Sequence, residues 1–310
     1  MSFGEPGLEE RETIENGSLT ACLSGFTDII LNSNTLPVID SKADVIYVQS
    51  KNKNNTLKIH PLGALTLKSE GLEMAELREM FDSGAVGFYD YKMSVKNPNL
   101  LKTALQYVQH FDGLIMTFPF EKSICENGQI NEGEMSTLYG LEGIPSLSEE
   151  IIVERDLKIL EYTGGKLFIP TISTSKSVEL IKNAKQKGLQ VITSVSINNL
   201  FFNEKKLKNF DTRFKVLPPI RSEEDRIILV KALSEGVIDF CTSDHSPIDI
   251  DNKKTDFKNS LFGATGLESV FGALNSLYKT EKVIEILTRK RDLFGIKNDA
   301  IDLGLSLIHI

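Results

Sequence analysis

Short apolar runs alternate with amphipathic helical patterns along most of this chain, and this alternation limits the fold more than any other feature. The runs 113–118 (GLIMTF), 166–173 (KLFIPTIS) and 189–196 (LQVITSVS) are too short for helices and suit buried strands. The segments 149–165 and 176–188 between them carry helical patterns that stop at glycine. Repeated strand–helix units predict a parallel sheet covered by helices.

The same patterns continue on both sides of this central region. The predicted strands are residues 27–31, 43–49, 85–90, 113–118, 166–173, 189–196 and 237–243. The predicted helices are residues 72–84, 99–111, 149–165, 176–188, 223–236, 267–278 and 281–295. About seven or eight strand–helix units over roughly 270 residues favour an α/β fold of the (β/α)8 barrel type over an open doubly wound sheet. No glycine-rich nucleotide-binding motif follows any predicted strand.

Charge and composition exclude several classes of partner. The net charge of −8 argues against a nucleic-acid-binding surface, because phosphate binding depends on clustered basic side chains. No apolar run approaches the ~18 residues of a membrane span. The three cysteines are widely spaced and suggest neither a disulfide framework nor a zinc motif. We therefore expect a cytoplasmic protein that binds neither nucleic acid nor membranes.

One candidate site stands out in CTSDHSPID, residues 241–249, where Asp244 and His245 follow a predicted strand. Functional side chains of a (β/α)8 barrel lie at the carboxyl ends of its strands. An Asp-His pair in that place is typical of a metal or acid–base site. The chain holds only four histidines, and the other three lie far away in sequence.

These strand ends, taken with the segments between them, resemble dihydroorotase of the amidohydrolase superfamily. The segments that carry the resemblance are GEPGLEERETIENGSLTACLSGFTDI (4–29), NTLPVID (34–40), LEGIPS (141–146), ISTSKSVELIKNAKQKG (172–188), FKVLPPIR (214–221), CTSDHSPID (241–249) and FGATGLES (262–269). The resemblance implies one metal-dependent amidohydrolase TIM barrel over residues 1–300, with the family's small β-sandwich domain largely missing. We expect residues 301–310 to be a truncated or artefactual tail.

The resemblance also implies a zinc site at the barrel mouth that cleaves a cyclic amide, and most of its ligands are replaced here. Three positions that match the family's ligand histidines are Ser2, Phe118 and Thr171, and the position of its substrate-binding arginine is Gly4. The retained positions are Asp244 (general base and metal ligand), Asp90 (metal ligand), and Asn34, Arg221 and Gly266 (substrate binding).

Each retained carboxylate also has a structural interpretation. Asp244 can be a capping carboxylate that orders the loop before Ser246 and Pro247. Asp90 can cap a turn or pair with the nearby Lys92. Two carboxylates alone supply fewer protein ligands than the three or four of ordinary zinc sites.

The other retained residues have structural interpretations too. His245 can be an ordered strand-end side chain bonded to backbone. Asn34 is as plausible a turn former as a substrate contact. Arg221 precedes the acidic run 222–225 and can form a structural ion pair there.

From these losses we expect a dihydroorotase-like protein of pyrimidine biosynthesis that is catalytically inactive and needs no cofactor. The family includes inactive members that assemble with aspartate carbamoyltransferase, so the expected role is a structural or regulatory partner of that enzyme, or else a homo-oligomer. The alternative is an active cyclic amide hydrolase with a reduced zinc site that uses Asp244. A third interpretation, a barrel that senses a dihydroorotate-like molecule, is weakened by the loss of arginine at Gly4.

Overall fold

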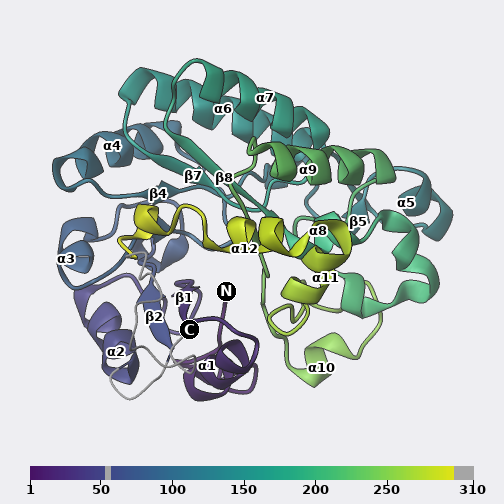
Figure 1. Ribbon diagram of the computed structural model, residues 1–310, viewed down its shortest axis with the longest axis horizontal. Coiled ribbons are helices and arrows are strands. Elements are labelled where there is room, and N and C mark those ends of the chain that lie inside the picture. The colour runs from purple at the N-terminus through teal and green to yellow at the C-terminus, as the bar shows by residue number, and fades with distance from the viewer. Residues whose placement is uncertain (53–56, 297–310) are drawn as a thin grey trace.

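Nine strands, all in parallel pairs, are found in the computed structural model, which describes residues 1–52 and 57–296. They are β1 (Asp28–Leu31), β2 (Lys58–Pro61), β3 (Phe88–Tyr89), β4 (Ile115–Met116), β5 (Ile130–Asn131), β6 (Gly143–Ile144), β7 (Leu167–Ile169), β8 (Val191–Ser196) and β9 (Phe240–Thr242). β5 and β6 form a separate small pair, and the other seven surround a common interior (Figure 1).

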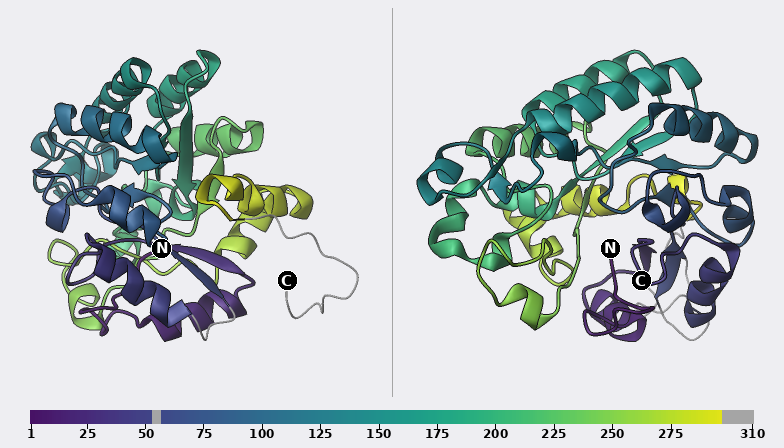
Figure 2. Two further views of the ribbon diagram at one scale, coloured as in Figure 1. Left: turned by 90° about the vertical axis from the view of Figure 1, so that its left-hand side faces the viewer. Right: turned by 180° about the vertical axis from the view of Figure 1, so that it is seen from behind.

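The seven strands follow one another around the barrel, and the first residues of the chain complete the ring. β1 pairs with β2, a parallel bridge from Gly63 to Phe88 links β2 to β3, and β3, β4, β7, β8 and β9 follow in that order. The carbonyl of Met1 accepts the N–H of Asn32 at 2.9 Å, and the N–H of Ser2 donates to the His245 carbonyl at 2.8 Å. Residues 1–2 therefore take the eighth position, between β1 and the end of β9, and Figure 2 shows the N-terminus beside β1.

Helices cover the outside of this ring. The α-helices are α1 (Ile14–Leu23), α2 (Lys42–Asn52), α3 (Leu77–Asp82), α4 (Pro98–Val108), α5 (Glu134–Tyr139), α6 (Leu147–Thr163), α7 (Ser175–Gln186), α8 (Ile197–Phe201), α9 (Glu223–Glu235), α10 (Ile250–Lys253), α11 (Val270–Leu277) and α12 (Thr280–Thr288). The 3₁₀ helices are η1 (Leu67–Ser69), η2 (Gln109–Phe111), η3 (Lys122–Ile124), η4 (Glu204–Phe210), η5 (Thr212–Phe214) and η6 (Arg291–Phe294). α4, α6, α7 and α9 run side by side along the outer edge of β4, β7 and β8 (Figure 1). This arrangement confirms the predicted (β/α)8 barrel.

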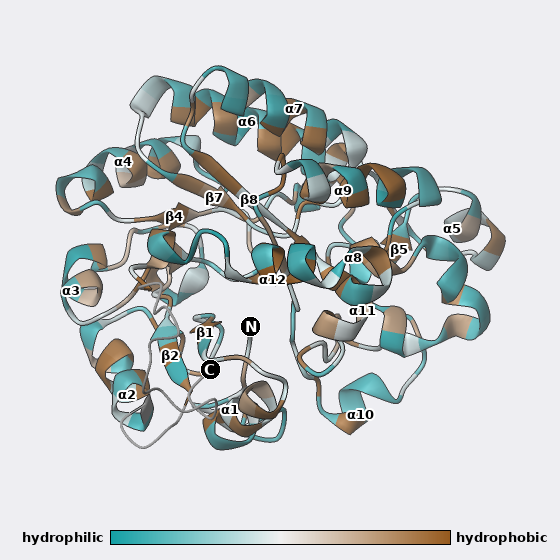
Figure 3. Ribbon diagram, viewed as in Figure 1, coloured by the Kyte–Doolittle hydropathy of each residue, from teal (hydrophilic) through white to brown (hydrophobic). Residues whose placement is uncertain are grey.

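Successive strand residues enter two different cores, because side chains alternate between the two faces of a strand. Ile115, Leu167 and Val191 pack outward against the helices. Met116 and Phe168 point inward into a second cluster that lies inside the barrel. All three residues of β7 (LFI) are apolar, and this strand is brown in Figure 3. β8 (VITSVS) is buried along its whole length although half of its residues carry hydroxyl groups.

One predicted strand is wrong. Residues 43–49 belong to helix α2, although their β-branched side chains favoured a strand. Val45 and Val48 are buried while Ile46 between them is half exposed, so burial repeats at helical rather than alternating spacing. The Asp44 carboxylate accepts the N–H and hydroxyl of Ser41, which fixes the start of this helix. The strand that follows, β2, was not predicted.

The described residues test only part of the predicted domain boundaries. All strand pairs in the two described ranges are parallel, so they contain no antiparallel sandwich. The expected tail, residues 301–310, lies outside the described residues, as does the end of the predicted domain at residue 300. Within the described ranges, no helix has both the length and the apolar character needed to cross a lipid bilayer.

Candidate functional site

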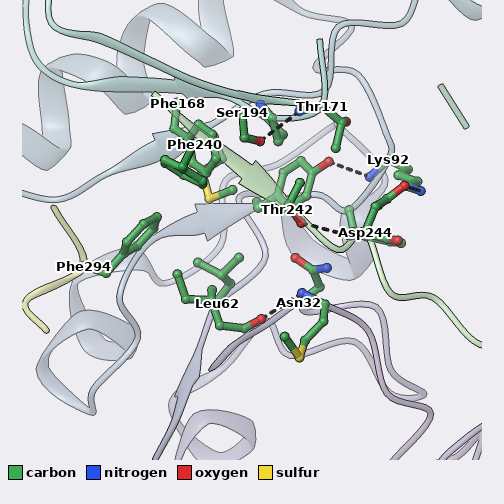
Figure 4. A pocket seen from close by; sticks show the side chains of 16 residues that line it. Asn32, Leu62, Lys92, Phe168, Thr171, Ser194, Phe240, Thr242, Asp244 and Phe294 are labelled. Atoms are coloured by element: carbon green, nitrogen blue, oxygen red, sulfur yellow. Dashed lines mark hydrogen bonds and ion pairs between the residues drawn. The ribbon is translucent and has the colours of Figure 1, made fainter. Parts of the chain in front are cut away.

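A cavity of about 90 Å³ lies in the barrel interior and reaches the carboxyl ends of the strands (Figure 4). Its lining comes from β1, β3, β4, β7, β8 and β9 and the residues that follow them, from Leu62 just after β2, from Met1, and from η6 near the end of the described chain. Lys92, Thr171 and Asp244 lie on one side of this cavity, and Phe168, Phe240 and Phe294 lie on the other. Of the predicted site residues, Asp244 and Thr171 line the cavity.

Asp244 is held in a buried ion pair with Lys92. The Lys92 Nζ lies 3.0 Å from Asp244 Oδ2, and the two side chains are only 13% and 7% exposed. Burial lowers the pKa of Lys92, but the neighbouring Asp244 and Tyr91 together outweigh this effect, so the pKa of Lys92 is raised above its ordinary value. Lys92 is therefore a cation at neutral pH. Its ammonium binds the Asp244 carboxylate that a metal ion would need as a ligand.

His245 points away from the cavity that its neighbour Asp244 lines. Its Nδ1 accepts the backbone N–H of Gly266 at 3.2 Å, which places the ring proton of the neutral form on Nε2. Nε2 then donates to Glu12 Oε2 at 2.7 Å, and the ring packs edge-on against Phe3. The Asp-His pair is therefore divided between two environments, and His245 connects the strand end to the N-terminal segment through a side chain as well as backbone.

Asp90 is bound by the loop after β2. One carboxylate oxygen accepts the N–H groups of Leu65 at 2.9 Å and Thr66 at 3.0 Å, and the other accepts the Thr66 hydroxyl at 2.6 Å. Burial raises the pKa of Asp90 in spite of these donors. The capping interpretation holds, but the expected pairing with Lys92 is wrong, because the Lys92 ammonium contacts Asp244 instead.

Arg221 lies in a buried polar network outside the cavity lining. Its guanidinium donates to Ser173 Oγ at 3.0 Å, to Asn131 Oδ1 at 2.9 Å and to the Ile144 carbonyl at 2.8 Å. Its ion-pair partner is Glu149, with an N–O distance of 3.9 Å. The expected pairing with the acidic run 222–225 is therefore wrong, since the partner comes from α6.

Asn34, Gly266 and Gly4 also lie outside the cavity lining. Asn34 Oδ1 is buried without a hydrogen-bond partner among the described residues. A Cβ on Gly266 would lie 2.4 Å from the Ser243 carbonyl oxygen, so the close approach of these two segments requires glycine. A Cβ on Gly4 would lie 1.7 Å from the Leu8 oxygen, so this turn excludes any side chain, arginine included.

The positions that match the family's ligand histidines offer few metal ligands. Ser2 Oγ accepts the Asn32 amide at 3.2 Å, and Phe118 is buried in the apolar cluster of the barrel interior. Thr171 offers one neutral hydroxyl. Zinc sites use three or four nitrogen, sulfur or carboxylate ligands, and no group of three His, Cys, Asp or Glu side chains suited to a metal occurs within residues 1–52 and 57–296. With Asp90 and Asp244 both bound to other donors, these residues do not fit a zinc pair.

Sequence reasoning missed three features of this region. Lys92 was considered only beside Asp90, although its place just after β3 puts it at the barrel mouth. Glu12, the partner of His245, and Phe294, which enters the interior from η6, carry no motif of their own. The strand-end rule could have found Lys92, but no local signal identifies the other two.

Sequence comparison relates the chain to one family. Residues 1–177 match the family described as Dihydro-orotase-like. The dihydroorotase of Pelotomaculum thermopropionicum is 33% identical over 307 residues, which cover 97% of this chain and 72% of that protein. The dihydroorotase of Acetivibrio thermocellus is 35% identical, with coverage of 97% and 73%. For the 36% identical dihydroorotase of a Thermoanaerobacter species, the chain spans 65% of the relative's length.

Solved structures with a similar fold agree with the barrel. The L-hydantoinase (dihydropyrimidinase) of Arthrobacter aurescens superposes with a TM-score of 0.80 at 22% identity and covers 95% of this chain and 70% of its own. The dihydroorotase of Saccharomyces cerevisiae in complex with 5-fluoroorotic acid gives 0.72 at 14% identity, with coverage of 96% and 83%. At these identities the likeness concerns the fold alone.

Proposed function

Because the chain belongs to the dihydroorotase-like family of the amidohydrolase superfamily, we propose that it is a non-catalytic dihydroorotase homologue. In this proposal it acts in pyrimidine biosynthesis as a structural or regulatory partner of aspartate carbamoyltransferase. The proposal separates fold from chemistry, since a barrel can persist when the site built on it is lost.

The Lys92–Asp244 ion pair is the observation that most supports the proposed lack of activity. Hydrolysis of a cyclic amide needs an activated water, a polarised carbonyl and a base that can take a proton. Asp244 is the one retained candidate for that base, and its Oδ2 lies 3.0 Å from a buried ammonium. Neighbouring donors that fit a zinc pair are absent from the described residues, so no group is left to activate the water.

An activity assay with a matched variant tests this part of the proposal. The chain, expressed in medium supplemented with zinc or manganese, is assayed with dihydroorotate and, in reverse, with carbamoyl aspartate. We expect turnover no higher than that of Asp244→Asn, which keeps the shape of the side chain and removes its charge. Turnover by the wild type that Asp244→Asn abolishes, together with stoichiometric metal, would establish the alternative: an active cyclic amide hydrolase with a reduced site.

The partner role is tested separately. The barrel keeps two buried apolar cores although the site residues are replaced. A fold that is kept without its chemistry is expected when assembly with a partner maintains it. Mixing the chain with aspartate carbamoyltransferase of the same organism should give a stable complex in size-exclusion chromatography. If the two proteins elute separately at micromolar concentration, the partner role is wrong, and the elution volume of the chain alone then shows whether it forms homo-oligomers.

A further inference from the structure

The interior cavity has an apolar wall and a polar wall that come from different strands. At about 90 Å³ it exceeds the roughly 10–15 Å³ that one water needs, so it has room for one small organic molecule. The Lys92–Asp244 pair lies at one end, and a group of aromatic rings lies at the other (Figure 4).

The apolar wall is a cluster of three phenylalanines. The Phe168 ring lies 5.3 Å from Phe240 and 6.1 Å from Phe294, measured between centroids, and Phe240 lies 6.4 Å from Phe294. The rings are tilted or edge-on to each other, which is the favourable arrangement for aromatic pairs. They come from β7, β9 and η6, and together with Leu62 they present carbon surface to the cavity.

The polar wall contains two hydroxyls without a hydrogen-bond partner among the described residues, those of Tyr91 and Thr171. Thr171 is 5% exposed and lines the cavity, and its Oγ1 makes no hydrogen bond within the described part of the chain. The backbone at this β-branched residue is left-handed, with φ of +50°, and its N–H donates to Ser194 Oγ at 3.1 Å. A buried hydroxyl without a partner is costly, so a bound molecule or water that pairs with Thr171 is favoured.

The side-chain charges in the cavity cancel. Lys92 and Asp244 are the only charged side chains among the described lining residues, and each neutralises the other. Met1 also lines the cavity, but burial lowers the pKa of its amino group from 8.0 to about 6, so this group is mostly uncharged at pH 7. An ionised ligand would lose its hydration without gaining a free counter-charge, which is strongly unfavourable. The lining therefore favours an uncharged molecule over a carboxylate.

We propose that the barrel interior binds a small uncharged ring compound whose apolar side packs on Phe168, Phe240 and Phe294 and whose single hydrogen-bonding group pairs with Thr171. This binding function goes beyond the proposed partner role. It differs in ligand charge from a site for the anionic dihydroorotate.

The test uses three fluorinated probes of similar size that differ in one group. These are 4-fluorophenol, which is neutral with a hydroxyl, fluorobenzene, which lacks the hydroxyl, and 4-fluorobenzoate, which is anionic. Each is titrated into the full chain and followed by fluorine NMR. We expect saturable one-to-one binding of 4-fluorophenol, weaker binding of fluorobenzene and no saturable binding of 4-fluorobenzoate.

Two variants locate the bound probe. Thr171→Val keeps the shape of the side chain and should weaken 4-fluorophenol about 3- to 10-fold, the range expected for one hydrogen bond, while fluorobenzene is unchanged. Thr103→Val, which changes an exposed threonine on α4, should alter neither. Binding of 4-fluorophenol that Thr171→Val leaves unchanged, equal binding of 4-fluorobenzoate, or no saturable binding at all, as when only water fills the cavity, would each overturn the proposal. These readouts are independent of turnover and of the carbamoyltransferase complex.

Discussion

Lys92 changes what Asp244 can do. At the end of β9, a lone carboxylate would attract a metal ion or a proton, but a buried ammonium 3.0 Å away already neutralises it. The two residues are 152 positions apart, and each lies just beyond the end of its strand. The Lys92 ammonium thus places a positive charge next to Asp244, so the carboxylate can stay buried although the described residues hold no cluster of metal-ligating side chains.

Breaking this pair on one side should be costly. Lys92→Met leaves Asp244 buried without a counter-charge, and we expect the free energy of unfolding to fall by about 3–5 kcal/mol. The double variant Lys92→Met/Asp244→Leu removes both charges and should recover most of that loss. Urea unfolding of the wild type and both variants gives the three values. A single variant within about 1 kcal/mol of the wild type would show that the ion pair does not hold in solution.

Lys215 should make stability depend on pH. It is 2% exposed, and its ammonium donates to the carbonyls of Phe257 at 2.7 Å and Lys258 at 3.0 Å rather than to a carboxylate. Burial lowers its pKa from 10.5 to about 8. The folded state then loses this proton near pH 8 while the unfolded state keeps it to about pH 10.5, so this group adds stability as the pH rises between these values.

The pH effect is measured against a variant that cannot titrate. As the pH is raised from 7.5 to 10, the unfolding free energy of the wild type should increase relative to that of Lys215→Met. The exposed Lys254→Met serves as the matched control and should follow the wild type. A constant difference between the wild type and Lys215→Met across this range would contradict the lowered pKa.

At the scale of elements, the 3₁₀ helix η6 closes the barrel interior. Phe294 packs on Phe168 of β7 and Phe240 of β9. Arg291, in the same short helix, pairs with Asp28 at the start of β1 at 2.9 Å, and His60 of β2 contacts the same carboxylate at 2.8 Å. η6 therefore connects the last described part of the chain to the first two strands.

Removal of the Phe294 ring should show how much the packing of η6 contributes to the stability of the barrel. Phe294→Ala takes away a side chain that is 7% exposed, and we expect a loss of about 3–5 kcal/mol in unfolding free energy. Tyr162→Ala on α6, where the residue is 78% exposed, should change stability by no more than about 0.5 kcal/mol. Equal effects of the two substitutions in thermal or urea unfolding would mean that η6 does not pack against the barrel.

At the scale of the whole molecule, stability should not depend on a divalent metal. A ligand that binds only the folded state at 1,000 times its dissociation constant stabilises that state by about 4 kcal/mol. We expect neither a chelator nor added zinc to shift the unfolding midpoint by more than about 1 °C, because the donors around Asp244 do not fit such a site. A rise of several degrees with zinc that Asp244→Asn removes would contradict this expectation.

The barrel was predictable because its signals are local. Most strands and helices from residue 85 onward follow from apolar run length, β-branched content and glycine stops, which reflect how each segment is buried. The short elements β5, β6, α5, α8 and α10 were not predicted. The error at α2 shows the limit of such signals: Val45 and Val48 also fit a strand, and only their packing settled the helix. The expected replacement of metal ligands also rests on residue type alone, since Ser2, Phe118 and Thr171 offer no imidazole wherever they lie.

The sequence by itself therefore determined the fold class and the family resemblance on which the expected loss of metal ligands rests. Only the tertiary structure decided that Asp244 meets Lys92 and that His245 meets Glu12, 233 residues away. It also brought Phe168, Phe240 and Phe294 around the cavity. Local patterns record the average burial of each segment, whereas these contacts join segments that are distant along the chain. Which residues meet in these contacts depends on how the strand ends and η6 come together in space. The sequence carries no periodic pattern that predicts this arrangement.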